Sequence, residues 1–241
     1  MHRLLVLTVA LGAFAACTSD SGGGIVIRQN LANDGARCVF TADSGNAFIA
    51  RGTIALQSPQ PYVLTPLLES NIVALQNQVS QRTIQTRGAR VSLTIAGASQ
   101  AGTSVMVNTT SFPAGALKFT SLFSAPIAPN GGLSVGEFDI IPTSFLEALG
   151  AQLTGANVHV QVVAEVKVYG TLGGDELESD PFYYPVTVCN DCVINPVGAC
   201  PIAMKGSLGN PCNPYQDGQI DCCTAADGQL LCPAPVATAL Q

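Results

Sequence analysis

The stretch VHVQVVAEVKV, residues 158–168, is the clearest strand in this sequence. Its even positions all carry valine or alanine, whereas its odd positions carry mainly polar residues, among them His159, Glu165 and Lys167. Because successive side chains of a β-strand point to opposite faces, this pattern predicts a long strand with one face on a core and the other in solvent. The rest of the chain is expected to fold around a sheet that contains this strand.

Other short stretches predict further strands before this one. Phe48 to Gln57 alternates between apolar and polar residues, and Cys38 to Thr41, Tyr62 to Glu69 and Val91 to Ile95 have the composition of strands. Turn-forming glycine, proline and asparagine residues lie between them. Many short strands separated by such turns are typical of a β-sandwich. We therefore expect residues 25–188 to form a mainly β domain, an immunoglobulin-like antiparallel β-sandwich.

One short helix is predicted to interrupt the strands. Ser144 and Glu147 have the spacing of a capping box, in which each side chain satisfies a free backbone N–H at the start of a helix. Phe145, Leu146, Leu149 and Leu153 then fall on one face at helical intervals. These residues predict an amphipathic helix that covers one end of the sandwich.

The segment that follows the glycine-rich turn after residue 170 is predicted to run back along the long strand. Leu177 to Cys189 forms this return, and it contains Pro181 and Pro185. Proline has no N–H to donate to a sheet, so this composition favours a strand at a sheet edge. An open edge can pair with a strand of another protein, which makes the return strand a candidate binding surface. The candidate contact residues on it are Phe182, Tyr183 and Tyr184.

The C-terminal part, residues 189–241, has little periodicity and contains seven of the nine cysteines. A segment with so few apolar residues needs cross-links, so it is predicted to be a small disulfide-rich module. Eight cysteines allow about 105 pairings, which leaves the connectivity open. If all eight pair, Cys38 must be joined to this tail. The eight are Cys38, Cys189, Cys192, Cys200, Cys212, Cys222, Cys223 and Cys232.

Charge and composition exclude some classes of partner. Charged residues make up only 11% of the chain, and the formal net charge is −6, which becomes −7 without Arg3. A polybasic surface is therefore absent from the sequence, and we expect no binding to nucleic acid. Low charge, many small and β-branched residues and an even set of cysteines indicate an exported protein, because disulfides persist in oxidising compartments.

The first 17 residues read MHRLLVLTVALGAFAAC. A short positive start, an apolar run too short to span a bilayer and a group of small residues are the pattern of a secretory signal peptide. The end of this run, Phe14-Ala15-Ala16-Cys17, resembles the lipobox of bacterial lipoproteins. The resemblance implies that residues 1–16 are removed and that the sulfur of Cys17 carries a diacylglycerol. A further N-linked acyl chain, such as palmitate, completes the anchor in that family.

The lipoprotein resemblance also implies where the protein is placed. Residues 17–24 combine the lipidated cysteine with a flexible Gly/Ser tether. Thr18 stands where retained inner-membrane lipoproteins carry an aspartate, so the resemblance implies the outer membrane and leaves its inner or outer face open. The expected partners are the membrane, through the lipid, and another envelope or extracellular protein, through edge-strand pairing. The expected function is a non-catalytic structural or binding module of the cell envelope.

Several alternatives stay open for the polar residues. Asp175, Glu176, Glu178 and Asp180 crowd one turn and are a weak calcium candidate, although a solvated turn that protects a sheet edge is the simpler reading. Asn213, Asp217 and Asp221 have the oxygen ligands of a calcium loop but lack its closing glutamate, because residue 224 is threonine. No metal or cofactor is expected.

The sequence gives less support to a catalytic function than to a structural or binding one. Cys189-x-x-Cys192 has the spacing of a redox or zinc motif, but it follows a predicted strand rather than opening a helix, so structural bridging is favoured. His159 is the only histidine after the leader, and no nucleophile-elbow motif is present. An exported carboxylate-dependent hydrolase with its site in loops, or an inhibitor-like tail that acts alone, remain as alternatives.

Overall fold

The computed structural model describes residues 23–33, 37–74, 82–190, 192–200 and 207–232. The predicted signal peptide, residues 1–16, the lipid site Cys17 and most of the tether lie outside the described residues. Within the described ranges the chain is mainly β, with one α-helix and four disulfides. None of the helical structure in these ranges is long and apolar enough to cross a membrane.

The regular elements follow one another with short connections. The strands of the body are β1 (Ile25–Asn30), β2 (Gly52–Ala55), β3 (Tyr62–Leu64), β4 (Pro66–Ser70), β5 (Ile84–Gln100), β6 (Thr103–Ser104), β7 (Lys118–Leu122), β8 (Pro126–Ile127), β9 (Leu133–Val135), β10 (Phe138–Ile141), β11 (Val158–Leu172), β12 (Asp175–Glu178) and β13 (Phe182–Cys189). The tail adds β14 (Ile194–Ala199), β15 (Ile220–Thr224) and β16 (Leu230–Leu231). A 3-10 turn spans Thr109–Ser111, and α1 spans Thr143–Gly150.

The predicted long strand is β11, and it lies inside the largest sheet. This sheet has the order β2-β13-β11-β5-β6, and β7, β8 and β12 extend it beside β5 and β11. The even positions from Val158 to Val168 are fully buried, which confirms the predicted alternation. β11 pairs antiparallel with β5 and β13, whereas β2 runs parallel to β13. Two long antiparallel partners fix the register of β11, because a slip of one residue would expose its valines.

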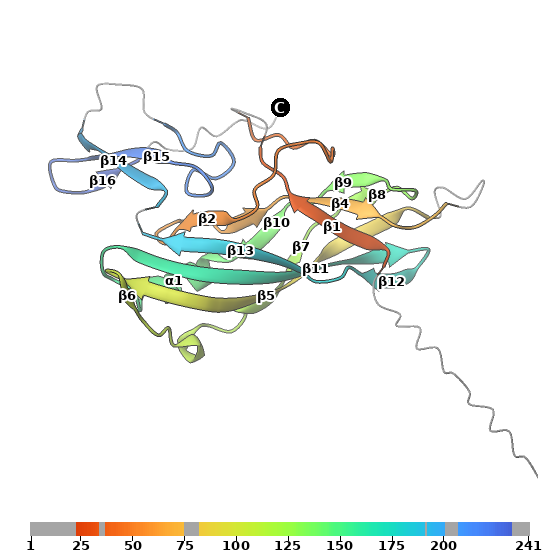
Figure 1. Ribbon diagram of the computed structural model, residues 1–241, viewed down its shortest axis with the longest axis horizontal. Helices are drawn as coiled ribbons and strands as arrows, with labels where there is room; N and C mark the ends of the chain where they lie inside the picture. Colours follow the sequence, from red (N-terminus) through yellow and green to blue (C-terminus); the bar gives the residue numbers. More distant parts are fainter. Residues whose placement is uncertain (1–22, 34–36, 75–81, 191, 201–206, 233–241) are drawn as a thin grey trace, which may run out of the picture.

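Two smaller sheets complete the body. They have the orders β1-β4-β9 and β10-β3, and the ribbon shows them on one side of the curved large sheet (Figure 1). The buried even residues of β11 share one core with side chains of these strands, including Ile25, Leu64 and Ile140. The mainly β prediction is therefore confirmed at the level of strand content and layered sheets.

The predicted helix is present, but its start differs from the prediction. Phe145, Leu146 and Leu149 are buried as expected, and Leu153 just after the helix is buried as well. Each such side chain contributes about 1.5–3 kcal/mol by leaving water. The capping box at Ser144 and Glu147 is wrong. The N-cap is Pro142, which makes no side-chain cap hydrogen bond, so the packed apolar face holds the helix in place.

Two of the predicted strands also differ. Cys38 to Thr41 forms no strand, and the alternation expected over Phe48 to Gln57 is paired as a strand only at β2. The side chain of Phe48 is 59% exposed rather than buried. The region before β2 connects to the sheets through an isolated bridge between Leu31 and Phe48, and Cys38 is held by a disulfide. Cross-linking replaces strand pairing in this part of the chain.

The return strand β13 lies at a sheet edge only in its first half. Its second half, Val186–Cys189, pairs with β2, so the edge prediction is wrong there. Among the described residues no strand pairs with Phe182 to Pro185 on the side away from β11. The parallel partner comes from more than a hundred residues earlier, and local proline content carries no information about it. The open edge is therefore limited to the first half of β13.

The tail forms a small sheet of its own and is bonded to the body. Its sheet has the order β14-β15-β16, and it lies near the end of β13 in the ribbon (Figure 1). Residues 213–217, which precede β15, form a turn that lies against β2, with an isolated bridge between Ile54 and Gln216. The disulfides join Cys38 to Cys212, Cys189 to Cys192, Cys200 to Cys223, and Cys222 to Cys232. Only the first of these links the tail to the start of the body.

Candidate functional site

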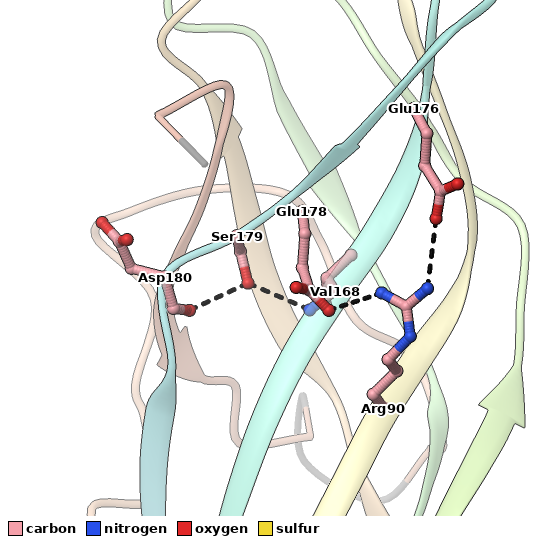
Figure 2. Close-up of polar contacts among 6 residues, drawn as sticks. All are labelled: Arg90, Val168, Glu176, Glu178, Ser179 and Asp180. Atoms are coloured by element: carbon pink, nitrogen blue, oxygen red, sulfur yellow. Dashed lines mark hydrogen bonds and ion pairs between the residues drawn. The ribbon is translucent and has the colours of Figure 1, made fainter. Parts of the chain in front are cut away.

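The predicted acidic turn is built around an arginine rather than around a metal site. Arg90 on β5 places its guanidinium between two carboxylates of β12, at 3.1 Å from Glu176 and 2.5 Å from Glu178 (Figure 2). The guanidinium also lies 4.5 Å from the centre of the Tyr169 ring on β11. Gly88 leaves the space for this ring, because a Cβ there would come within 2.9 Å of the Tyr169 hydroxyl.

These ion pairs argue against the calcium alternative. Two of the four candidate carboxylates already face a cation, and the side chain of Asp180 points away from the guanidinium (Figure 2). The backbone carbonyl of Asp180 accepts from Ser179, whose hydroxyl also accepts from the Val168 amide. Among the described residues no group of three or more His, Cys, Asp or Glu side chains could hold a metal ion.

The ion pairs contribute little to stability. The side chains of Arg90 and Glu176 are 50% and 66% exposed, and water and salt screen such pairs. The two glutamates raise the pKa of the Arg90 guanidinium through their hydrogen bonds, so it stays charged. The two ion pairs connect β12 to β5, and β12 itself pairs with β11. The charged side chains cover the sheet edge at β12.

The three candidate contact residues of β13 do not share one surface. Tyr183 is 60% exposed and faces out beside Glu165, whereas Tyr184 is only 2% exposed. Phe182 is partly buried and stacks on the Tyr184 ring with centroids 6.1 Å apart. Alternation along the strand forces neighbouring side chains to opposite faces. The prediction of Tyr184 as a contact residue is therefore wrong, and Tyr183 is the exposed member of the three.

Cys189 and Cys192 form a disulfide inside a small apolar cluster. Cys189 is fully buried, and Ala55, Val193 and Tyr215 pack around the pair. No helix begins among the described residues next to this pair, so they provide no helix dipole of the kind that lowers a thiol pKa in redox proteins. The surroundings fit a structural bridge.

One buried group of hydrogen-bonded polar side chains was not predicted from the sequence. We call it the tyrosine–aspartate chain, and it consists of Asn30, Tyr184, Tyr62 and Asp217. Asn30 Nδ2 donates to Tyr184 Oη at 2.8 Å, the two tyrosine oxygens lie 3.0 Å apart, and Tyr62 Oη donates to Asp217 Oδ2 at 2.6 Å. It therefore connects β1, β13 and β3 with the tail.

The direction of the hydrogen bonds in this chain follows from its two ends. Tyr184 Oη already accepts from Asn30, and the hydrogen of Tyr62 goes to Asp217. The bond between the two hydroxyls is therefore donated by Tyr184. Every hydroxyl hydrogen then has an acceptor, and the Asp217 carboxylate is the final one. Among the described residues no buried side-chain nitrogen or oxygen lacks a partner.

Burial dominates the electrostatics of the tyrosine–aspartate chain. Loss of water raises the pKa of the Asp217 carboxyl, and the donors Tyr62, Thr53 and Gln216 oppose that rise only in part. Burial also raises the pKa of Tyr184 to about 12 and the pKa of Tyr62 well above its usual value. Both tyrosines therefore stay protonated, and Asp217 is the member that titrates first.

The remaining oxygen-rich residues of the tail serve separate contacts. The Asp221 carboxylate accepts from the Ser207 amide at 2.7 Å and from Asn195 at 2.6 Å, and the amide's hydrogen bond lowers its pKa. Asn213 donates to the Pro61 carbonyl at 2.9 Å. Asp217 and Asp221 are thus engaged by different parts of the chain.

A hollow beside Asp217 lacks, among the described residues, the pair of carboxylates that a glycoside hydrolase needs. Arg51, Thr53, Cys192 and Gln219 are among the residues that line it, and Asp217 is its single carboxylate. A carboxylate pair is what glycoside hydrolysis requires. His159 lies elsewhere, on the outward face of β11.

Comparison with protein-family models, with curated proteins and with solved structures finds no match for this chain.

Proposed function

We propose that this chain is an exported lipoprotein of the cell envelope that acts as a non-catalytic structural or partner-binding module. The observation that carries the proposal is the set of four disulfides, which take up all eight cysteines other than Cys17. Such bonds require an oxidising compartment outside the inner membrane. In this proposal the apolar leader directs export. Cys17, at the end of the stretch that resembles a lipobox, Phe14–Cys17, carries the lipid anchor.

The anchor in this proposal is a diacylglycerol on Cys17 with a further acyl chain on its amino group. Two or more chains give stable membrane attachment, whereas a single chain binds reversibly. Thr18 after the cysteine favours the outer membrane by the same resemblance. Described structure begins at Gly23, so only a few tether residues separate the anchor from β1.

We propose an immunoglobulin-like sandwich as the finer architecture of the body. Two features support it, namely the packing of β1-β4-β9 against the large sheet across one apolar core and the largely antiparallel pairing of the long strands. In this architecture the open half of β13 lies on the large sheet, at a position where an added strand would continue it.

The anchoring proposal predicts the intact mass of the protein purified from membranes. The wild-type chain should begin at Cys17, carry the mass of its acyl chains and react with an alkylating reagent only after reduction. Cys17→Ser should lack the lipid and move to the soluble fraction, since its anchor is lost. A wild-type mass without lipid would overturn the anchoring proposal, and thiols that react without reduction would overturn the disulfide argument.

The binding proposal predicts a contact at the open half of β13. An extended segment of another envelope protein would pair with Phe182 to Pro185 and place its side chains beside Tyr183. A photo-crosslinking residue at position 183 should give a defined adduct in intact envelopes, and Tyr183→Ser should weaken capture of the same protein. Met106, which is 97% exposed, is the matched control position for both experiments. Equal adducts from positions 183 and 106 would contradict the edge-pairing proposal.

The hydrolase alternative has little support in the described residues, because the hollow beside Asp217 contains one carboxylate. The inhibitor-like alternative requires that residues 189–241 fold alone. The tail, however, is attached to the body: its residues 213–217 are hydrogen-bonded to β2 and β3, and Cys212 is joined to Cys38. These contacts argue against independent folding of the tail. A structural or binding role of the whole chain accounts for both observations.

A further inference from the structure

A small cavity lies where the loop after β1, the strand pair β3–β10 and the tail before β15 meet. Its volume is about 60 Å³, enough for a few water molecules or for one small ligand group. Both cysteines of the Cys38–Cys212 bond line it. Its apolar lining consists of the side chains of Leu31, Phe40, Ile49 and Val63. An alkyl chain in this cavity would therefore leave water and lie against apolar side chains.

The hydroxyl of Thr65 is available to a ligand in this cavity. Thr65 is only 5% exposed, and its backbone is engaged, because its amide donates to Asn30 Oδ1 and its carbonyl accepts from the Leu31 amide, both at 2.9 Å. The hydroxyl is hydrogen-bonded to none of the described residues. Since no fully buried side-chain oxygen of these residues lacks a partner, this hydroxyl must be open to the cavity that Thr65 lines. A nearly buried hydroxyl of this kind favours an occupant that can hydrogen-bond to it.

A carboxylate lies beside this hydroxyl. β10 and β3 pair antiparallel with Phe138 opposite Leu64. Continued by one residue, this register puts Glu137 opposite Thr65, and both residues line the cavity. Opposite residues on one face of a sheet have their Cβ atoms about 5 Å apart, so one small group can contact both side chains. Glu137 makes no ion pair with any described residue, and none of the described residues that line the cavity is basic.

We propose that this cavity binds a primary ammonium group at the end of an alkyl chain, as carried by a lysine side chain of a partner protein. The Glu137 carboxylate and the Thr65 hydroxyl accept hydrogen bonds from the ammonium, and the methylene groups lie against Leu31 and Val63. A cavity of this size fits the compact ammonium of lysine better than the planar guanidinium of arginine. The site depends neither on the lipid anchor nor on strand pairing at β13, so each proposal can fail without the others.

Titration of the oxidised, ¹⁵N-labelled chain with Nα-acetyl-lysine methylamide tests the proposal. The amide signals of Leu31, Val63 and Thr65 should shift and saturate, with a dissociation constant in the millimolar range for so small a probe. The Leu93 amide, which donates to Leu117 on the large sheet, should stay constant. The constant should rise with added salt, because the attraction is partly electrostatic. Absence of saturable shifts at the three amides would overturn the proposal.

Three further probes identify which part of the ligand is recognised. The norleucine analogue lacks the ammonium and should bind about tenfold more weakly or worse, since it leaves the Glu137 carboxylate without its partner. The arginine analogue should also bind more weakly, because its guanidinium is larger. Phosphoethanolamine carries the ammonium of a lipid headgroup on a two-carbon stem and should bind more weakly as well. Equal affinity for any of these three would contradict recognition of a lysine side chain.

Two variants remove the proposed contacts one at a time. Glu137→Gln keeps the shape but not the charge, and it should raise the dissociation constant of the lysine probe about tenfold or more. Thr65→Val should also weaken binding, yet it should not lower the free energy of unfolding, because the hydroxyl has no hydrogen bond within the described residues.

Glu147→Gln is the matched control for the charge, since Glu147 is an exposed carboxylate on α1 that makes no ion pair with any described residue. It should leave the dissociation constant unchanged. Unchanged binding in Glu137→Gln or Thr65→Val would overturn the proposal. An equal loss of binding in Glu147→Gln would do the same, because it would reduce the effect to the overall charge of the chain.

Discussion

Replacement of Cys38 and Cys212 by serine is expected to lower the free energy of unfolding more than the loss of a disulfide within the tail. This bond closes a loop of 174 residues. In the chain-entropy model, closing such a loop lowers the conformational entropy of the unfolded chain, which stabilises the folded state by about 5 kcal/mol. Cys38 is exposed and Cys212 is partly exposed, so serine at these positions leaves no apolar cavity. Denaturant unfolding under non-reducing conditions measures the difference.

The matched control is the double replacement of Cys200 and Cys223. Their bond spans 23 residues, for which the same model gives about 3 kcal/mol. The first variant should also speed exchange at the Thr53 and Ala55 amides, since the residues that accept from them, Asp217 and Tyr215, then lose the nearby covalent link at Cys212. The control variant should leave these amides protected. Equal losses of stability in the two variants, with unchanged exchange at Thr53, would contradict the view that Cys38–Cys212 fastens the tail to the body.

Part of the fold was predictable because its signal is local. The alternation from Val158 to Val168 and the spacing of Leu146 and Leu149 each depend on neighbouring residues, and the structure confirms both. The capping box at Ser144 was wrong because tertiary packing of the helix made a side-chain cap unnecessary. At β11 and α1 the local pattern thus predicted both the element and the face that it buries.

Long-range pairing was not predictable from the same patterns. The parallel contact between β2 and β13 turns half of a predicted edge into an interior strand, and no local residue signals it. The members of the tyrosine–aspartate chain are also far apart in sequence, with separations of 154 positions from Asn30 to Tyr184 and 155 positions from Tyr62 to Asp217. A tyrosine in a strand and an aspartate before a glycine are ordinary residues until the fold brings them together.

Replacement of Gly52 by alanine is expected to destabilise the body through Tyr62. An alanine Cβ at this position would lie 2.5 Å from the Tyr62 hydroxyl and 2.6–2.7 Å from two ring carbons. The end of a tyrosine side chain can often move away from such a contact. Here the ring is fully buried and its hydroxyl is bonded to both Tyr184 and Asp217, so movement would break the tyrosine–aspartate chain. Overpacking of this kind costs about 1–3 kcal/mol, and the broken hydrogen bonds to a charged group add about 1.5–3 kcal/mol.

Gly97→Ala is the control for the glycine substitution, because nothing lies within 4 Å of a Cβ at that position of β5. It should be neutral or slightly stabilising, since alanine restricts the unfolded chain more than glycine does. Gly52→Ala should also increase exchange at the Val63 amide, because its acceptor Gln216 is next to Asp217, to which Tyr62 donates. If Gly52→Ala were as stable as Gly97→Ala, the Tyr62 ring would have room to move. The hydrogen-bonded chain from Asn30 to Asp217 would then be too loose to fasten the tail.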